Sequence, residues 1–418
     1  MKIKISHISK FHNLGSAMMG INMVYYLTSL LVKKGIEDIE YYTDSSSQKE
    51  LELLKKTSEY KKIYMEKTSG ETDNKDGFFL IRKLKSFKGI FDQAKKASQE
   101  YDCHIVLGGD DLSEYYGKKR VMIEALRLNL ESRNMDVFLT GQTIGPFYSY
   151  RKILIPYFIR NTYSYSRDDK TYLYAKNELN INNVYNARDL AFLDLPEQDN
   201  LEDRDMLLAK FGLEPERYIT IVPSGLSGLY TENTEKYIDN YLSVIINLLD
   251  ERLEDKKIVL LTHVTEPDVN NDRRMVKAIV ERLKDEYLDR IVTIDKELLP
   301  HQARWILGSG MFSLSGRMHA AVSTYQMGKP AICLSYSVKY EGVIGQGLNM
   351  KNLVIESAND ELWEQNEIAD KVLIKVDYIL RNYSTILNEI EKSVKDCKEK
   401  ALYMVKDVAD KIVSSKGR

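Results

Sequence analysis

The sequence predicts an α/β fold built from two Rossmann-like domains and completed by C-terminal helices. Short apolar runs recur along the chain, and several end in glycine or charged residues before a helical pattern begins, as parallel strands and their covering helices do. The length of 418 residues is typical of two domains. An acidic, polar stretch at 196–205 separates two halves with the same pattern. We therefore expect domains at 1–195 and 206–360 and a helical extension at 361–418.

The first half alternates predicted strands and helices from its first residues. Ile3, Ile5 and Ile8 alternate with polar residues in an opening strand, and a glycine turn then leads into an apolar helix over 18–33. The charged segment 44–96 includes a predicted exposed loop at 69–77. Further strands are predicted at 37–42, 103–107, 137–139 and 161–165, and further helices at 121–133 and 168–176.

The second half repeats this alternation and is followed by helices alone. The extension has apolar residues at helical spacing, such as Val372, Val376 and Ile379, which indicates helices packed over the domains. Strands are predicted at 218–222, 257–261, 291–294, 310–314, 331–334 and 352–355, and helices at 237–251, 272–284 and 317–327.

Composition limits the classes of function. With 60 basic and 62 acidic residues the formal net charge is −2, so no global field favours nucleic acid, and anion binding must be local. Three widely separated cysteines suit a reducing cytoplasm. The polar N-terminus does not resemble a signal peptide, and no apolar run is expected to approach the ~20 residues that span a bilayer. We expect a cytoplasmic protein, with membrane contact at most peripheral.

The stretch from Gly310 to Lys339 predicts an anion site. It has the pattern strand, Ser315-Gly316 turn, helix, strand, and ligands of such units gather where the helix presents free N–H groups and its positive dipole end. Arg317 and His319 fall in the first helical turn, and Lys339 follows the next strand. Three groups able to bind an anion are therefore expected at one edge of a sheet.

Other polar groups after strands leave two interpretations open. Asp110 and Asp111 follow Gly108-Gly109 and fit either an acidic metal pair or a helix cap. Asp168 fits either a catalytic base or a cap that holds Arg167. Gln142, in the stretch 141–147, fits either a ligand-binding loop or a rigid turn. The remaining histidines form no metal-ligand pattern, so we predict no metal site. They are His7, His12, His104, His263 and His301.

Seven short motifs, in order, resemble those of the polysaccharide pyruvyl transferases. Together they extend from near the start of the chain to about Leu348. The chain departs from the family's usual pattern in having Ser16 where an Asp is common and Asp110 where a third Gly is common. The motifs are Asn13-Leu14-Gly15, Gly108-Gly109, 141–147 (GQTIGPF), Ser166-Arg167-Asp168, 189–192 (DLAF), 315–319 (SGRMH) and 334–340 (LSYSVKY).

The resemblance implies a glycosyltransferase-B-like fold with two facing Rossmann-like domains. It also implies transfer of pyruvate from phosphoenolpyruvate to a saccharide of a bacterial cell-surface polysaccharide, such as a capsule or exopolysaccharide, without a further cofactor. The implied catalytic residues are His319, Arg317 and Lys339. The implied donor-binding residues are Arg167, Ser315, Gly316, Arg317, His319 and Lys339, and the acceptor-binding ones are Asn13, Gly15, Gly109, Asp110 and Gln142.

These residue types suit that chemistry. Planar guanidinium groups bind phosphate and carboxylate oxygens bidentately, which favours Arg317 and Arg167 for a donor that carries both groups. Ketal formation needs an acid once and a base twice, and an imidazole, whose ordinary pKa is ~6.5, supplies either. We therefore assign proton transfer to His319 and charge compensation of the departing phosphate to Lys339.

Two other functions stay open from the sequence. The same architecture serves glycosyltransferases with nucleotide-sugar donors, because a fold alone does not fix a function. A non-catalytic saccharide-binding protein of envelope assembly is the second alternative. The acceptor implied by the resemblance is a lipid-linked repeat unit at the inner face of the plasma membrane. The basic, aromatic stretch Tyr148 to Tyr165 fits either a membrane-binding helix or a buried one.

Overall fold

The computed structural model describes residues 1–8, 11–66, 79–253, 255–265 and 271–416. The predicted loop at 69–77 lies outside the described residues. Contacts divide the chain into two compact units. The first unit comprises residues 1–11, 19–190 and 400–418, and the second comprises 12–18 and 191–399.

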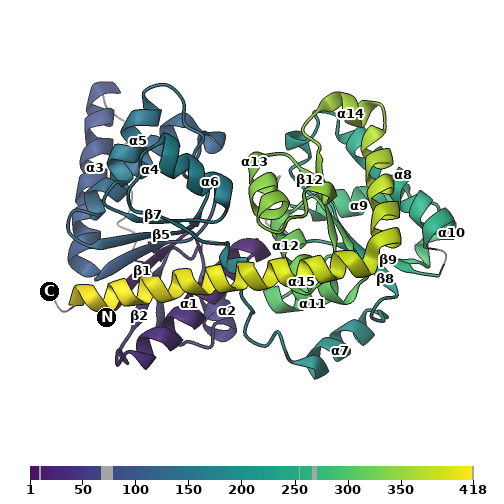
Figure 1. Ribbon diagram of the computed structural model, residues 1–418, viewed down its shortest axis with the longest axis horizontal. Helices are drawn as coiled ribbons and strands as arrows, with labels where there is room; N and C mark the ends of the chain where they lie inside the picture. The colour runs from purple at the N-terminus through teal and green to yellow at the C-terminus, as the bar shows by residue number, and fades with distance from the viewer. Residues whose placement is uncertain (9–10, 67–78, 254, 266–270, 417–418) are drawn as a thin grey trace. The chain divides into compact units, whose positions relative to one another are not determined.

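The first unit has a seven-stranded parallel sheet in the order β3-β2-β1-β4-β5-β6-β7. Helices α1 and α2 cover one face and α3, α4 and α5 the other (Figure 1). The strands are β1 (Lys2–Ser6), β2 (Glu40–Thr43), β3 (Ile63–Met65), β4 (Cys103–Val106), β5 (Asp136–Gln142), β6 (Tyr163–Ser166) and β7 (Val184–Asn186). The helices are α1 (Leu14–Lys33), α2 (Gln48–Thr57), α3 (Phe79–Glu100), α4 (Lys118–Glu131), α5 (Arg151–Ile159) and α6 (Asp169–Leu173).

The second unit has a six-stranded parallel sheet in the order β10-β9-β8-β11-β12-β13. Both sheets therefore have the 3-2-1-4-5-6 order of a Rossmann fold, to which the first sheet adds β7 at its edge. The strands are β8 (Tyr218–Val222), β9 (Lys257–Leu261), β10 (Ile291–Ile294), β11 (Ser313–Ser315), β12 (Ala331–Ser335) and β13 (Val354–Glu356). The helices are α7 (Leu201–Lys210), α8 (Thr234–Asn247), α9 (Arg273–Arg282), α10 (Asp285–Leu288), α11 (Pro300–Ser309), α12 (Met318–Gln326), α13 (Val338–Tyr340), α14 (Asp360–Glu364) and α15 (Glu367–Lys416).

Strands β8, β9 and β10 are rich in β-branched and apolar residues, as strands of a sheet with both faces covered are. All five residues of β8 are buried, as are all five of β12. In the first unit, β4 and β5 pack against α3, α4 and α5 around Val106, Val137 and Leu139. In the second, β8 and β9 pack against α7, α11 and α12 around Val222, Val259 and Leu261.

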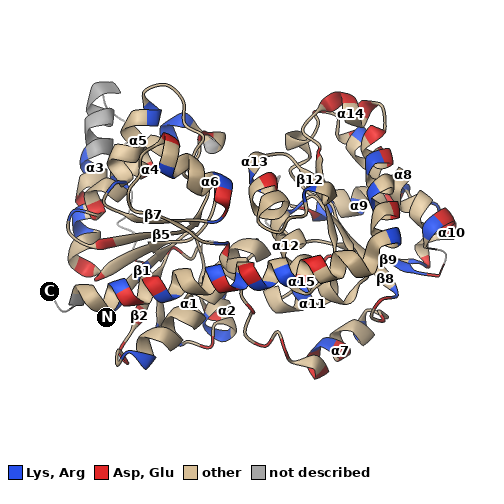
Figure 2. Ribbon diagram, viewed as in Figure 1, with Lys and Arg blue, Asp and Glu red and all other residues tan. Residues whose placement is uncertain are grey.

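The division of the chain differs from the expected domain limits at both ends. The N-terminal segment 12–18 belongs to the second unit, although it lies within the expected first domain. The expected linker at 196–205 contains the start of α7, which Asn200 caps. The expected extension contains most of α14 and one long element, α15, which has a kink at Asn382. The residues from Lys400 onward belong to the first unit. Acidic and basic residues are interspersed along this helix (Figure 2).

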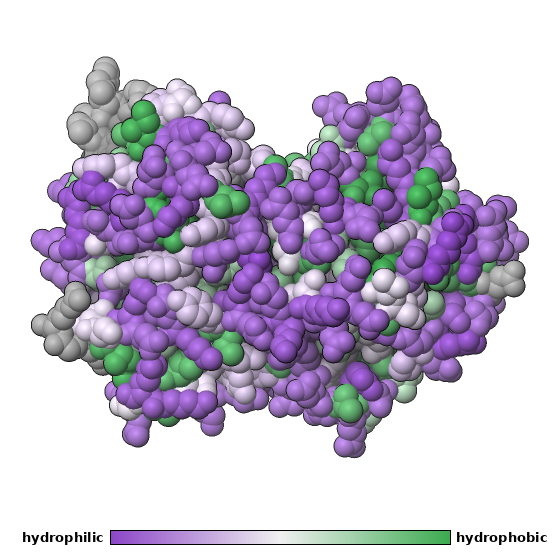
Figure 3. Space-filling view, viewed as in Figure 1, coloured by the Kyte–Doolittle hydropathy of each residue, from purple (hydrophilic) through white to green (hydrophobic). Residues whose placement is uncertain are grey.

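Helix α1 corrects one expectation. By length and composition it is apolar enough to cross a membrane, with a mean hydropathy of 1.3, and it is the one such helix among the described residues. The expectation that no apolar run approaches that length is therefore wrong. However, 61% of its most apolar window is buried, and Met23, Leu27 and Leu31 are fully buried, as in the core helix of a soluble domain. The face drawn in Figure 3 is mostly hydrophilic, with separate hydrophobic groups.

Candidate functional site

The candidate site of the second unit lies at the carboxyl edge of its sheet. The strand order reverses between β8 and β11, and ligands of open α/β sheets bind beyond the carboxyl ends at such a switch point. Arg317 follows β11 and is the N-cap residue of α12, so the unpaired N–H groups of this nine-residue helix begin beside it. The loops after β8 and β9 reach the same place.

Arg317 is held by a buried carboxylate. Its Nε and Nη2 donate to Oδ1 of Asp272 over 3.0 and 2.6 Å, and the Asp272 side chain is fully buried. The same carboxylate accepts N–H groups from Gly225 at 2.8 Å and Val264 at 2.8 Å. Burial raises the pKa of Asp272, while Arg317 and these N–H groups oppose the rise. Burial alone would lower the pKa of Arg317, but Asp272 more than offsets it, so the guanidinium stays charged.

Asp272 therefore joins the guanidinium of Arg317 to the loops after β8 and β9. It was not among the residues predicted from the sequence, because it lies 45 residues before Arg317. Its position at the start of a predicted helix gave no sign of its partner. Ser315, a predicted donor-binding residue, holds the turn locally. Its hydroxyl accepts the N–H of Arg317 at 3.0 Å and donates to the carbonyl of Arg317 at 2.7 Å.

His319 lies against the backbone of Gly15. A Cβ atom on Gly15 would lie 2.2 Å from Nδ1 and 2.5 Å from Cγ of His319, distances at which atoms overlap. The segment around Gly15 is attached to the loop after β9, since Asn13 forms an antiparallel bridge with Val264 and Thr265 donates to the carbonyl of His12 at 2.8 Å. The N-terminal motif is thus part of the second unit and borders the imidazole.

This placement differs from the expectation that Asn13 and Gly15 belong to the N-terminal, acceptor-side domain. The expectation assumed that residues near the start of the chain all belong to the first domain. In the structure, the first turn of α1 belongs to the second unit and the rest of this helix to the first. The Asn13 side chain accepts the N–H of Gly15 at 3.2 Å, which shapes the turn before α1. Their role in acceptor binding stays a prediction.

A second histidine, His263, lies beside this group. It is 1% exposed, and its Nε2 has no hydrogen-bond partner among the described residues. Burial lowers its pKa to about 3, and the charges of His319, Arg317 and Arg304 act in the same direction. It is therefore a neutral imidazole at physiological pH. Its place two residues after a predicted strand is the signal in the sequence that could have identified it.

A cluster of buried aromatic residues fixes the turn at Gly316. The phenols of Tyr230 and Tyr340 both donate to the Gly316 carbonyl, at 2.6 and 2.9 Å. A Cβ on Gly316 would lie 3.1 Å from the Cβ of Ser224, so the position favours glycine. Lys339 donates to the Tyr336 hydroxyl at 2.8 Å and lies 4.7 Å from its ring centroid. The Tyr336 phenol also contributes to the pKa of Arg317, which places it near both cations.

The second unit thus brings together most of the predicted donor residues. Ser315, Gly316, Arg317 and His319 lie around one turn, and Lys339 is linked to it through Tyr336. Among the described residues, no group of three or more His, Cys, Asp or Glu side chains could hold a metal ion.

Arg167 lies in the first unit and is 1% exposed. Its Nε donates to the Thr143 hydroxyl at 2.8 Å, and its Nη1 pairs with Asp189 at 3.5 Å. Its Nη2 is buried and has no hydrogen-bond partner among the described residues. Asp168 accepts the N–H of Thr171 at 2.7 Å and caps α6, which confirms that it is a helix cap. The side chain of Arg167 is held by Thr143 and Asp189 instead.

The other predicted residues of the first unit lie at the ends of β4 and β5. Gln142 is fully buried, and its Nε2 donates to the Leu107 carbonyl at 2.7 Å, which favours the rigid-turn interpretation. Gly109 is bridged to Gln142 in parallel register. The carbonyl of Asp110 accepts the Ser113 hydroxyl at 2.6 Å. Asp111 pairs with Arg120 at 2.8 Å rather than with a second carboxylate, so the acidic pair is used in local contacts.

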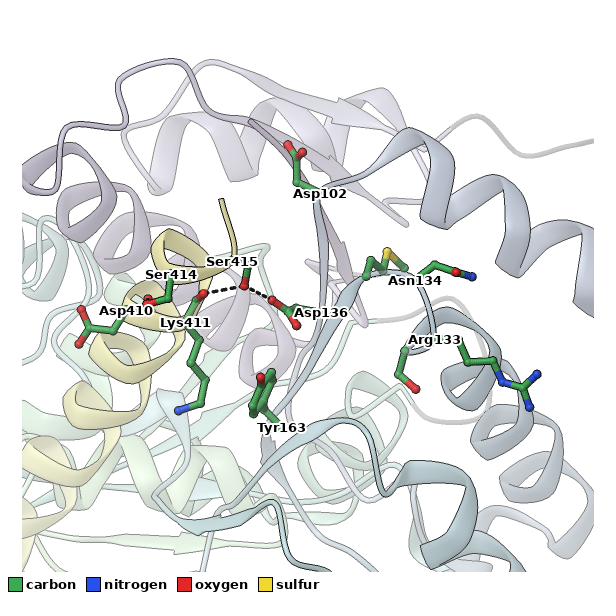
Figure 4. Close-up of a pocket in the computed structure, with 11 residues that line it drawn as sticks. Asp102, Arg133, Asn134, Asp136, Tyr163, Asp410, Lys411, Ser414 and Ser415 are labelled. Carbon is green, nitrogen blue, oxygen red and sulfur yellow. Dashed lines mark hydrogen bonds between the residues drawn. The ribbon is translucent and has the colours of Figure 1, made fainter. Parts of the chain in front are cut away.

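A cavity of about 600 Å³ lies at the opposite edge of the first sheet. Its lining comes from the amino ends of β4, β5 and β6 and from the end of α15, and includes Asp102, Asp136 and Tyr163 (Figure 4). Lys411 extends over the Tyr163 ring at 5.3 Å. The predicted site residues follow the carboxyl ends of the strands, so none of them lines this cavity.

The chain is similar in fold to solved structures of UDP-GlcNAc 2-epimerases. UDP-GlcNAc 2-epimerase from Neisseria meningitidis, solved bound to UDP-GlcNAc, is 11% identical with a TM-score of 0.60, over 99% of this chain and 100% of that one. The Rickettsia bellii enzyme UDP-N-acetylglucosamine 2-epimerase is 14% identical with a TM-score of 0.57, over 99% and 96%. No curated protein matches the sequence. At these identities the likeness shows the fold alone, which is glycosyltransferase-B-like, as predicted.

The family of the chain is identified from its sequence and not from its fold. The model of the polysaccharide pyruvyl transferase family matches residues 13–338, most of the chain. The chain therefore belongs to the polysaccharide pyruvyl transferases, which confirms the predicted resemblance.

Proposed function

We propose that the protein transfers the pyruvyl group of phosphoenolpyruvate to two hydroxyls of a saccharide and releases inorganic phosphate. The observation that carries the proposal is the pair of Arg317, fixed by buried Asp272, and His319, fixed against Gly15, at the start of α12. The family supports pyruvyl transfer as the general reaction. The donor and the roles below are our proposal.

The turn offers what a small, doubly anionic donor needs. Arg317 is a permanent cation with a fixed orientation, and α12 adds N–H groups and its positive dipole end. Lys339 supplies a second, compact cation near Tyr336. His263 adds a neutral, buried imidazole whose Nε2 is available to an oxygen. Phosphate and carboxylate oxygens both accept such donors.

The reaction is balanced by proton transfers that His319 can perform. The enol carbon C3 gains a proton, a sugar hydroxyl attacks C2, and the bond from C2 to the phosphate oxygen breaks. A second hydroxyl then closes the ketal, and the two hydroxyl protons end on C3 and on phosphate. His319 moves protons between these oxygens and carbon. Lys339 and Arg317 offset the negative charge of the departing phosphate.

Membership of the family also supports a proposal for the acceptor and for the cellular location of the reaction. We propose a saccharide unit of a bacterial cell-surface polysaccharide, carried on a lipid, and action in the cytoplasm at the inner face of the plasma membrane. Gly109, Asp110 and Gln142 border the carboxyl edge of the first sheet and are the acceptor-side candidates there. No cofactor other than the donor is proposed.

Phosphate release from phosphoenolpyruvate across a panel of acceptor glycosides tests the proposal. His319→Gln should lower kcat by at least ~100-fold, because general acid-base catalysis typically contributes 10² to 10⁴. Arg317→Lys should chiefly raise the donor KM, since lysine lacks the planar fork that pairs with Asp272. Arg217→Lys is the matched control, because its pair with Asp255 is exposed at 51% and 58% and surface pairs contribute little.

Two outcomes would contradict the proposal. Near-normal turnover by His319→Gln would show that His319 does not transfer protons in the reaction. Thermal stabilisation by UDP but not by phosphoenolpyruvate would favour a nucleotide-sugar glycosyltransferase, because a ligand stabilises the protein that binds it.

A further inference from the structure

We propose that α5 and the residues that flank it form a docking face for an anionic lipid bilayer. Helix α5 is apolar on two sides. Ile155 and Ile159 are fully buried in the core of the first unit. The opposite side is exposed: Tyr150 is 57%, Ile153 74% and Tyr157 52% accessible.

The exposed residues form one continuous helical face. Positions 150, 153, 154 and 157 are spaced by three and four residues, so they project from the same side of the helix. Leu154 is 37% exposed. Spacing of this kind normally indicates a face packed into a core, but here that face lies outside. Figure 3 shows a hydrophobic group on the surface over α5.

The loops next to α5 extend this face with aromatic residues. Tyr148 is 61% exposed and Tyr115 is 51% exposed. They lie near one another, because the Tyr148 phenol contributes to raising the pKa of Tyr115. The Tyr148 N–H donates to Glu114 at 2.6 Å, which joins the two loops. Tyrosine prefers the boundary between hydrocarbon and water, since its ring is apolar and its hydroxyl polar.

The charge around this face is positive. Residues 147–160 contain Arg151, Lys152 and Arg160 and no acidic residue. The Arg160 guanidinium lies 3.8 Å from the Tyr157 ring centroid, so a cation borders an exposed aromatic ring directly. Lys118 and Lys119 are exposed at the start of α4, which packs on α5.

Three of the acidic groups that the structure describes lie near this face. The pKa of Tyr115 is raised by burial and also by the charge of Asp110. The cations of Lys118, Lys119 and Arg160 outnumber this carboxylate.

Glu114 is only 5% exposed and is neutralised by Arg151 at 2.8 Å. Glu178 forms an exposed pair with Lys152 at 3.0 Å, and exposed pairs of this kind are weak. The cations that remain suit anionic headgroups, and each adds to the attraction.

A bilayer fits this face better than a second copy of the chain. In a two-fold dimer the same cations would meet across the interface and repel. Apolar and aromatic side chains at the centre with cations at the rim are the pattern of helices that lie in the membrane interface. Because α5 starts at the carboxyl edge of the sheet, after β5, the face borders the edge that carries Gln142 and Arg167. The inference does not depend on the proposed donor.

Co-sedimentation of the full-length protein with vesicles tests this proposal. Wild type should bind vesicles with phosphatidylglycerol in phosphatidylcholine and lose most binding at high salt or on pure phosphatidylcholine. Ile153→Glu should weaken binding by about tenfold, because an isoleucine side chain no longer enters the interface. Ile374→Glu, at a 63% exposed position of α15, is the matched control and should bind as wild type does. Ile153→Glu should keep the thermal midpoint of wild type, because position 153 is exposed and not part of the core.

Three results would overturn it. The first is no binding of wild type to anionic vesicles. The second is equal binding by wild type and Ile153→Glu. The third is concentration-dependent dimerisation of wild type that Ile153→Glu abolishes, because the face would then serve a second copy of the chain.

Discussion

Gly15 shows how a residue without a side chain can determine the position of another side chain, that of His319, to which we assign proton transfer. Glycine early in a helix is normally improved by alanine, by up to about 1 kcal/mol. At Gly15 the added Cβ would overlap the His319 ring, at 2.2 Å from Nδ1. The imidazole would have to move, so the stability and the activity of an alanine variant should respond in different ways.

We predict that Gly15→Ala lowers kcat by about tenfold or more while changing the thermal midpoint little, because a displaced imidazole loses part of its ~10²- to 10⁴-fold contribution. A double-mutant cycle measures the coupling: in a His319→Gln background, Gly15→Ala should have no further effect. Gly89→Ala, where a Cβ would meet nothing within 4 Å, is the control and should retain activity.

Imidazole resonances of histidine-labelled protein give a second measurement that does not depend on the substrate. The His319 signals, assigned with His319→Gln, should shift in Gly15→Ala and not in Gly89→Ala. Unshifted signals together with full activity would show that Gly15 does not position His319.

What the sequence predicts at this scale is the local part of the site. Ser315, Gly316, Arg317 and His319 were found because a strand, a turn and a helix follow one another within a few residues. Asp272, His263 and the contact of Gly15 come from other strands. Their partners depend on strand order, which local periodicity does not contain.

At the scale of elements, the turn from β11 to α12 is held by side chains from outside it. The Gly316 carbonyl accepts two phenols, Tyr230 from the loop after β8 and Tyr340 from α13. Both side chains are fully buried. The high tyrosine content of the chain therefore has a structural use here that composition did not reveal. The orientation of Arg317, the next residue, depends on this turn.

We predict that Tyr230→Phe and Tyr340→Phe each destabilise the second unit by about 1 kcal/mol, the usual net contribution of one hydrogen bond. The double variant should lose more than the sum, by about 1 kcal/mol, because the Gly316 carbonyl then loses both donors. Urea unfolding followed by tryptophan fluorescence measures this. Strict additivity would contradict a shared role at Gly316.

Tryptophan fluorescence reports the second unit specifically. The chain has two tryptophans, Trp305 and Trp363, and both are buried in that unit. Tyr287→Phe is a suitable control, because its hydroxyl contacts Asp250 at an exposed position of the same unit. Its effect should be close to zero.

Elements were predicted best where apolar runs were long. Strands β8, β9 and β12 are bounded almost as predicted, whereas β3 and β7, with three residues each, were missed. A run of three residues has too few side chains for periodicity alone to distinguish a strand from a loop. Strands β11 and β13 are equally short but overlap the strands predicted at 310–314 and 352–355. For α5 the sequence left a buried and a membrane-binding helix open, and the helix has both a buried and an exposed apolar face.

At the scale of the whole molecule, each unit buries a histidine whose pKa is lowered. Burial lowers the pKa of His104 in the first unit, although Glu131 opposes this at 2.6 Å. Burial lowers the pKa of His263 in the second unit to about 3, and electrostatic interactions with His319, Arg317 and Arg304 act in the same direction. Both units should therefore lose stability on acidification, since the unfolded chain binds protons that the folded chain excludes.

The pH range follows from the two pKa values of His263. In the unfolded chain its pKa is ~6.5, so its contribution is complete above that value and is lost as the pH falls toward 3. At pH 5 the loss is 1.5 pH units at 1.36 kcal/mol each, or about 2 kcal/mol. We predict that urea unfolding followed by tryptophan fluorescence gives a free energy lower by about this amount at pH 5.0 than at pH 7.5, beyond the change in His263→Gln. Because glutamine does not titrate, the pH dependence of the unfolding free energy of His263→Gln comes from the other titratable groups of the second unit. Equal pH dependences in wild type and His263→Gln would show that His263 is not held neutral.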